Sequence, residues 1–216
     1  MLVIPTTLNH FVLGAFKAVF LRLTTRHEPF AWDIDLPVKM VRDDLEAIPE
    51  YELPDGYAIR WYQPGDGEHW LRIHQECEGY GSLSANLFDE QFGTDPKVLR
   101  ERIAFVCRED GIPVSTNAAW MGDWNGVHWG RVHWVATSQD EQGKGLSKPI
   151  MTLICERLKS LGHDKAYLTT NTSRVRAIAL YTVFGFQAYW ETEKEELIWR
   201  ALGEKMKDIG HGILGL

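Results

Sequence analysis

Apolar residues follow strand-like or helical spacing along most of the chain from residue 56 onward. Runs rich in β-branched and aromatic residues predict strands at 57–62, 103–108, 114–121, 127–137, 165–170, 186–190 and 196–200. Helical spacing predicts helices over 66–77, from Ser82 or Ser84 onward, and over 96–103, 146–161 and 175–184. This order predicts an α+β fold with a mixed, mostly antiparallel central sheet flanked by helices.

The first 50 residues differ from this pattern and predict an extension. Apolar residues at helical intervals predict a short helix around 10–23. An irregular arm is expected after it, because prolines interrupt the stretch: Pro29, Pro37, Pro49 and Pro54. The arm packs on the core or makes a homodimer contact. We therefore expect an extension at 1–50, a domain at 51–203 and a fraying C-terminal tail at 204–216.

Composition excludes several classes of function. Of the 216 residues, 44% are apolar and 25% charged, which describes a soluble globular protein. The net charge of −7 argues against a nucleic-acid partner. No run reaches the roughly 18 apolar residues of a membrane span, and no secretory signal is evident. Three widely spaced cysteines form neither a disulfide framework nor a metal site, so we expect a cytoplasmic protein.

A glycine-bearing turn joins the strand at 127–137 to the helix at 146–161. It reads Gln142-Gly143-Lys144-Gly145-Leu146-Ser147. Glycines let the backbone turn tightly, and the unpaired N–H groups of a first helical turn attract anions. The segment therefore predicts a cradle for a pyrophosphate. It is neither a Walker loop nor a complete dinucleotide fingerprint.

Two segments together resemble the signatures of the GCN5-related N-acetyltransferase (GNAT) family. The turn at 142–147 resembles Gln/Arg-x-x-Gly-x-Gly/Ala, which in the family holds the pyrophosphate of acetyl-coenzyme A. The segment 177–186 resembles the second signature, a helix ending in Leu-Tyr before Gly-Phe. Gly145 and Tyr181 are 36 positions apart, which leaves room for the elements between them. The resemblance implies the acyl-coenzyme A N-acyltransferase fold over roughly residues 56–200.

The resemblance also implies a binding site for acetyl-coenzyme A. In the family, the strand before the loop parts from its neighbour and its freed backbone holds the pantetheine arm. This chain departs from the family at Ser147, which replaces Gly or Ala, and at Arg174, which replaces the usual Asn. The expected cofactor-binding residues are Val135, Ala136, Thr137, Gln142, Gly143, Lys144, Gly145, Leu146, Ser147, Asn171, Arg174 and Ala177.

Tyr181 is the expected general acid, because it matches the tyrosine of the family. A phenol with a pKa near 10 can protonate a departing thiolate whose pKa is roughly 8–9. The alternative is that Tyr181 only packs in the core.

His133 is the candidate general base, on the strand beside the loop. Strand alternation predicts that it shares a face with Val135 and Thr137. A structural histidine, a base at His128 or Asp123, and a chain of water molecules are the alternatives.

Four tryptophans gather between residues 120 and 134: Trp120, Trp124, Trp129 and Trp134. They line an acceptor pocket or fill a core. Strand alternation places them on one face only if no bulge interrupts the strands.

These observations predict an N-acetyltransferase that moves an acetyl group from acetyl-coenzyme A to a primary amine of a small molecule or peptide. The alternative is a non-catalytic acyl-coenzyme A-binding sensor or interaction module. Tyr181 favours the enzyme, whereas the lack of an evident base and of the usual Asn leaves room for the module. Sequence does not distinguish an antibiotic, polyamine, amino acid or protein terminus as the acceptor.

Overall fold

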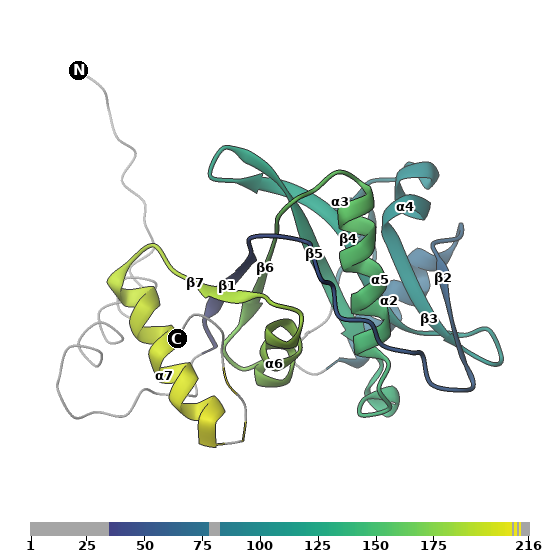
Figure 1. Ribbon diagram of the computed structural model, residues 1–216. Coiled ribbons are helices and arrows are strands. Elements are labelled where there is room, and N and C mark those ends of the chain that lie inside the picture. Colours follow the sequence, from purple (N-terminus) through teal and green to yellow (C-terminus); the bar gives the residue numbers. More distant parts are fainter. Residues whose placement is uncertain (1–34, 78–82, 209, 211, 213–216) are drawn as a thin grey trace.

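A computed structural model describes residues 35–77, 83–208, 210 and 212. They form a seven-stranded sheet in the order β2-β3-β4-β5-β6-β1-β7, with helices on both faces (Figure 1). The strands are β1 Pro37–Arg42, β2 Tyr57–Trp61, β3 Ile103–Arg108, β4 Pro113–Trp124, β5 Val127–Thr137, β6 Ala166–Asn171 and β7 Gln187–Tyr189. The helices are α2 Asp66–Glu76, α3 Leu87–Phe92, α4 Pro96–Arg102, α5 Ser147–Ser160, α6 Val175–Val183 and α7 Glu193–Asp208.

The expected mixed, mostly antiparallel sheet is confirmed. Only β5 and β6 pair in parallel, and every other neighbouring pair is antiparallel. Strand β4 continues to Trp124, three residues beyond the predicted 114–121, so the β4–β5 turn consists of Asn125 and Gly126, both with positive φ. That geometry suits a two-residue hairpin, because it matches the twist of the strands.

The core has two parts, one on each face of the sheet. The first face carries α5, α6 and α7, and its core includes Val132, Ile154, Ile178 and Leu202. The second face carries α2, α3 and α4, with an aromatic core around Trp70. Helix α5 follows the expected stripe, since Ile150, Ile154 and Leu158 recur every four residues and are fully buried.

The stretch expected to be an irregular arm contains a strand. All six residues of β1 pair with β6, and three of them also pair with β7, so 37–42 is part of the central sheet. Pro37 lies at its first position, where a missing N–H is tolerated. The helix expected around 10–23 lies outside the described residues. From β1 the chain crosses α5 to reach β2 near the other edge of the sheet (Figure 1).

The strand expected at 196–200 is wrong, because these residues belong to α7. Ile198, Trp199, Leu202 and Met206 are buried at helical spacing against the first face. The helix continues to Asp208, so the start of the expected tail is also helical. The part of the chain that the structure describes contains no helix with the length and apolar character of a membrane span.

Candidate active site

The parallel strands β5 and β6 separate close to their start. They pair only at Gly130 with Ala166 and at Arg131 with Tyr167. From Val132 to Thr137, the backbone of β5 has no strand partner on the β6 side among the residues that the structure describes. Unpaired main-chain donors and acceptors on an internal strand are available to a ligand that brings its own polar groups.

A β-bulge in β5 lies within this separated segment. The register with β4 shifts between Thr116 and Ala118, and Trp134 has a φ of 52°. The extra residue interrupts alternation, so His133 and Trp134 both contact aromatic rings of the second face. Val135 packs against the core of the first face. The expectation that His133 shares a face with Val135 is therefore wrong, because the bulge lies between them.

The glycine-bearing turn leads from β5 into α5. Gly143 and Gly145 have φ values of 78° and 83°, which favour glycine. Helix α5 has no side-chain cap, and the backbone N–H groups of residues 143–148 donate no hydrogen bond within the described chain. Gln142 donates through Nε2 to the carbonyl of Thr137 at 3.2 Å, which holds the turn against the end of β5. Free amides on an exposed turn fit two linked phosphates.

Glu141 supports the turn through hydrogen bonds of its side chain. It is not among the site residues expected from the sequence. Its buried carboxylate accepts a hydrogen bond from Tyr57 Oη at 2.6 Å and one from Lys144 Nζ at 2.9 Å. The bond from Tyr57, with the Lys144 cation beside it, holds the pKa of Glu141 below its usual value. No local pattern reveals this contact, because Tyr57 lies 84 residues earlier in the chain.

Tyr181 lies on α6 and is buried. Its ring is edge-on to Phe186 with 6.3 Å between centroids. It belongs to the core of the first face, which also contains Leu146 and Ile150 from the start of α5. Ala177 lies one helical turn earlier on the same side of α6.

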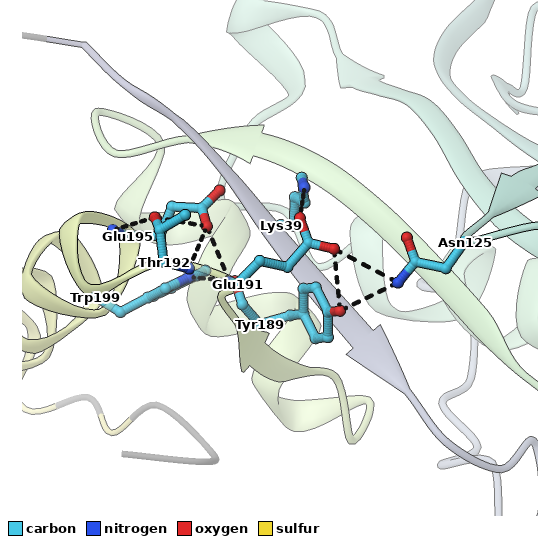
Figure 2. A network of polar contacts seen from close by, with 7 residues as sticks. All are labelled: Lys39, Asn125, Tyr189, Glu191, Thr192, Glu195 and Trp199. Atoms are coloured by element: carbon cyan, nitrogen blue, oxygen red, sulfur yellow. Dashed lines mark hydrogen bonds and ion pairs between the residues drawn. The ribbon is translucent and has the colours of Figure 1, made fainter.

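The four tryptophans divide into two groups. Trp120 and Trp134 pack against the second-face core, whereas Trp124 and Trp129 stack near the end of the β4–β5 hairpin. The hairpin end also contacts β7, because the ring centroid of Trp124 lies 4.9 Å from that of Tyr189. Figure 2 shows the accompanying polar network, in which Glu191 accepts from Lys39, Tyr189 and Asn125.

Comparison with known proteins agrees with this geometry. Residues 67–186, more than half of the chain, match the Acetyltransferase (GNAT) family. The chain belongs to the GNAT family.

Curated GNAT relatives include mycothiol acetyltransferases. The one from Streptomyces coelicolor is 27% identical over 165 residues, covering 71% of this chain and 48% of that protein. The one from Thermomonospora curvata is 28% identical over 153 residues, covering 66% and 48%. The chain thus spans about half the length of the curated relatives it matches.

Solved structures show the same fold. A GCN5-related N-acetyltransferase from Sphaerobacter thermophilus superposes with a TM-score of 0.57 at 20% identity, covering 72% of this chain and 48% of that one. A tandem GNAT protein from the clavulanic acid biosynthesis pathway has a TM-score of 0.52 at 15% identity, covering 73% and 51%. The acyl-coenzyme A N-acyltransferase fold expected from the sequence is therefore confirmed.

Two residues that were expected to bind the cofactor, Asn171 and Arg174, lie in the segment directly before α6. Asn171 donates through Nδ2 to Asp35 at 2.6 Å, and the backbone N–H of Ser173 donates to the same carboxylate at 3.1 Å. The Asn171 amide is thus held at the end of β6. Arg174 is half-buried directly before α6, and its charge acts on both Asp35 and Cys77. Asp35 is bonded to the end of β6, and Cys77 directly follows α2.

His133 is enclosed by the aromatic core of the second face. Its ring centroid is 5.6 Å from that of Phe92, and only 9% of the residue is exposed. Burial, reinforced by the Arg131 cation, lowers the pKa of His133 to about 3. An imidazole with that pKa is neutral but weakly basic at neutral pH.

The alternative bases lie near the hairpin end. Asp123 accepts a hydrogen bond from the backbone N–H of Gly126 at 2.8 Å, which closes the turn. His128 is exposed, with its ring 5.7 Å from that of His163. Both positions precede the separation of β5 and β6 at Arg131.

Proposed function

We propose that this GNAT chain acetylates a primary amine of a small molecule or peptide with acetyl-coenzyme A as the donor. The observation that carries the proposal is the separation of β5 and β6 directly before a turn with unpaired N–H groups. The turn supplies donors for phosphates, and the separated strand supplies donors for a thioester arm. Membership of the GNAT family supports this assignment.

The proposal assigns the binding contacts to the main chain. When bound, acetyl-coenzyme A supplies an activated thioester whose carbonyl carbon is open to attack by an amine. Residues 143–148 bind the pyrophosphate through their N–H groups, with Lys144 kept beside them by Glu141. The backbone of Val135, Ala136 and Thr137 binds the arm, and an N–H near Val135 stabilises the charge that develops on the carbonyl oxygen.

Tyr181 is the proposed proton donor to the leaving sulfur. As the amine nitrogen bonds to the acetyl carbon, the carbon–sulfur bond breaks and the thiolate takes the phenolic proton. The amine gives up its own proton to water in this proposal. The low pKa of His133 makes that histidine a poor acceptor.

We assign the position of the usual family Asn to Arg174. A guanidinium suits a phosphate anion, and the half-buried Arg174 directly precedes α6. Asn171 keeps a structural role, because its amide is bonded to Asp35. Ala177 lies on α6, one helical turn before Tyr181.

The acceptor is a small molecule in this proposal, in keeping with the mycothiol acetyltransferases among the relatives. We also propose a cytoplasmic location, which suits three cysteines that are all free thiols. A homodimer contact through the N-terminal extension stays a prediction.

The test is release of free thiol from acetyl-coenzyme A in the presence of single amines, with calorimetry of cofactor binding in parallel. We expect thiol release that depends on the amine and an acetylated product visible by mass spectrometry. Tight cofactor binding without turnover on any amine would favour the sensor module instead. Absence of cofactor binding would overturn both functions.

A further inference from the structure

Arg131 occupies a distinctive place in the sheet. It forms, with Tyr167, the last pair before β5 and β6 separate. On its other side it pairs with Trp120, whose side chain packs against the second-face core. Paired residues on adjacent strands project to the same face, so the Arg131 side chain lies on the second face, opposite α5.

The Arg131 guanidinium has no anionic partner in the part of the chain that the structure describes. None of the ion pairs formed there includes it, and its Nε is buried without a hydrogen bond. Its contact is with the face of the Tyr167 ring, 5.7 Å from the centroid. A half-buried guanidinium offers a planar fork of donors that matches a carboxylate.

The structure holds the Tyr167 ring tightly in place. A Cβ on Gly122 of β4 would lie 1.9 Å from Tyr167 Oη, so only glycine leaves room for the hydroxyl. The Trp124 ring packs against the Tyr167 ring, with 4.7 Å between the two centroids. Arg131 therefore rests on a fixed aromatic surface, which limits the orientations of its side chain.

Two lysines lie near the tryptophan rings beside Arg131, although the chain as a whole is acidic. Lys39 lies 5.7 Å from the Trp124 ring and Lys165 lies 5.4 Å from the Trp129 ring. Each lysine is already paired with a carboxylate, Lys39 with Glu191 and Lys165 with Asp43. Both lysines are therefore neutralised locally, and Arg131 supplies the positive charge that an anionic group of the acceptor would meet here.

We propose that the acceptor is an aminocarboxylate, an amine that carries a carboxylate and an apolar or ring-bearing portion, and that Arg131 binds the carboxylate. The inference rests on the proposed function, which binds the thioester arm along the separated segment of β5 that begins directly after Arg131. The rings of Trp124 and Trp129, both half-buried, pack against the remainder of the acceptor. Arg131 is thus a specificity-determining residue.

The experiment compares amines that differ only in the carboxylate, in the full chain and in Arg131→Gln. The pairs are L-phenylalanine with L-phenylalaninamide and L-leucine with L-leucinamide, with spermidine as a cationic amine. We measure kcat/KM for thiol release, and also binding by tryptophan fluorescence without acetyl-coenzyme A. For each pair we divide kcat/KM for the acid by kcat/KM for the amide. Comparing this ratio between the variant and the parent chain cancels the intrinsic reactivity of each amine.

We expect Arg131→Gln to lower this ratio roughly tenfold to a hundredfold, as loss of a charged hydrogen-bonded contact predicts. Arg157→Gln is the matched control, because Arg157 is also half-buried over a ring, that of Trp61 at 4.2 Å, and forms no ion pair among the described residues. It should leave the ratio unchanged.

An unchanged ratio in Arg131→Gln, or failure of both acids to bind, overturns the inference. Equal turnover of acids, amides and spermidine would overturn it while leaving the acetyltransferase function standing. Binding of acids that depends on Arg131, without turnover of any amine, would support it and overturn the proposed chemistry.

Discussion

The glycines of the 142–147 turn make the most local contribution to the site. Gly143 has a φ of 78° and its added Cβ would meet no atom within 4 Å. Gly143→Ala therefore acts through backbone conformation, at about 1–2 kcal/mol. If the turn shifts to relieve this strain, its N–H groups lose their alignment. We expect the KM for acetyl-coenzyme A to rise about tenfold, measured by thiol release.

Gly111→Ala is the matched control for this variant. Gly111 has a φ of 81°, also with no atom within 4 Å of the added Cβ, in the turn between β3 and β4. Both variants should lose similar thermal stability, but only Gly143→Ala should change the KM. Equal KM values for the two variants would remove the turn from the cofactor site.

Removal of a single hydroxyl tests the proposed proton donor. Tyr181→Phe keeps the buried ring and its contact with Phe186. We expect kcat to fall at least a hundredfold while acetyl-coenzyme A binding by calorimetry stays the same. Tyr62→Phe removes a hydroxyl from another buried tyrosine, stacked on Phe88, and should leave kcat unaltered. A Tyr181→Phe enzyme with the parent kcat and pH–rate profile would exclude the phenol from catalysis.

Residue-scale prediction from the sequence succeeds where the signal is local. The glycines of the turn are visible because positive φ is required within a few residues of a helix start. The contact of Tyr57 with Glu141 and that of Asn171 with Asp35 join residues 84 and 136 positions apart. Neither contact leaves a trace in local spacing, so the support of the turn and the engagement of Asn171 emerge only from the fold.

At the scale of helices and strands, the packing of α2 against β5 makes the free energy of unfolding depend on pH. Together with Phe92 of α3, this packing buries His74 and His133, and burial lowers their pKa values to about 4 and about 3. In the unfolded chain both have a pKa near 6.5. Below pH 6.5 the unfolded chain therefore binds protons that the folded chain excludes. The stabilisation is complete above that pH and is lost as the pH falls.

We expect the free energy of unfolding to fall by about 1.2 kcal/mol for each of these histidines between pH 6 and 5. Urea denaturation over this range measures the slope, and carboxylates titrate mainly below it. His128→Gln, at an exposed position, should leave the slope as it is. A free energy of unfolding that does not vary between pH 6.5 and 5 would contradict the enclosure of both rings.

Element boundaries show where periodicity succeeds and where it fails. Helix α5 spans fourteen residues with a clear apolar stripe, so its position is evident in the sequence. The five residues 196–200 are too few to separate strand from helix. The helical period appears only when Leu202 and Met206 are included. The bulge at Trp134 inserts one residue without any glycine to mark it, so alternation fails there.

On the scale of the whole molecule, both ends of the described chain complete the sheet. Strand β1 lies between β6 and β7, more than a hundred residues later in sequence. A six-residue strand that begins at proline has a weak local signal, and its long-range pairing cannot be derived from spacing. The general architecture was nevertheless predictable, because most strands and helices carry their own periodicity.

The central claim is that the turn and the separated strands bind a thioester and pass its acetyl group to an amine. The most direct measurement uses acetyl-coenzyme A with a deuterated acetyl group, the wild-type chain and the amine panel, with products followed by mass spectrometry. The account predicts that the label moves to the amine nitrogen as free thiol appears in equal amount. Bound cofactor that keeps its label with every amine, or thiol release that does not depend on the amine, would contradict the account.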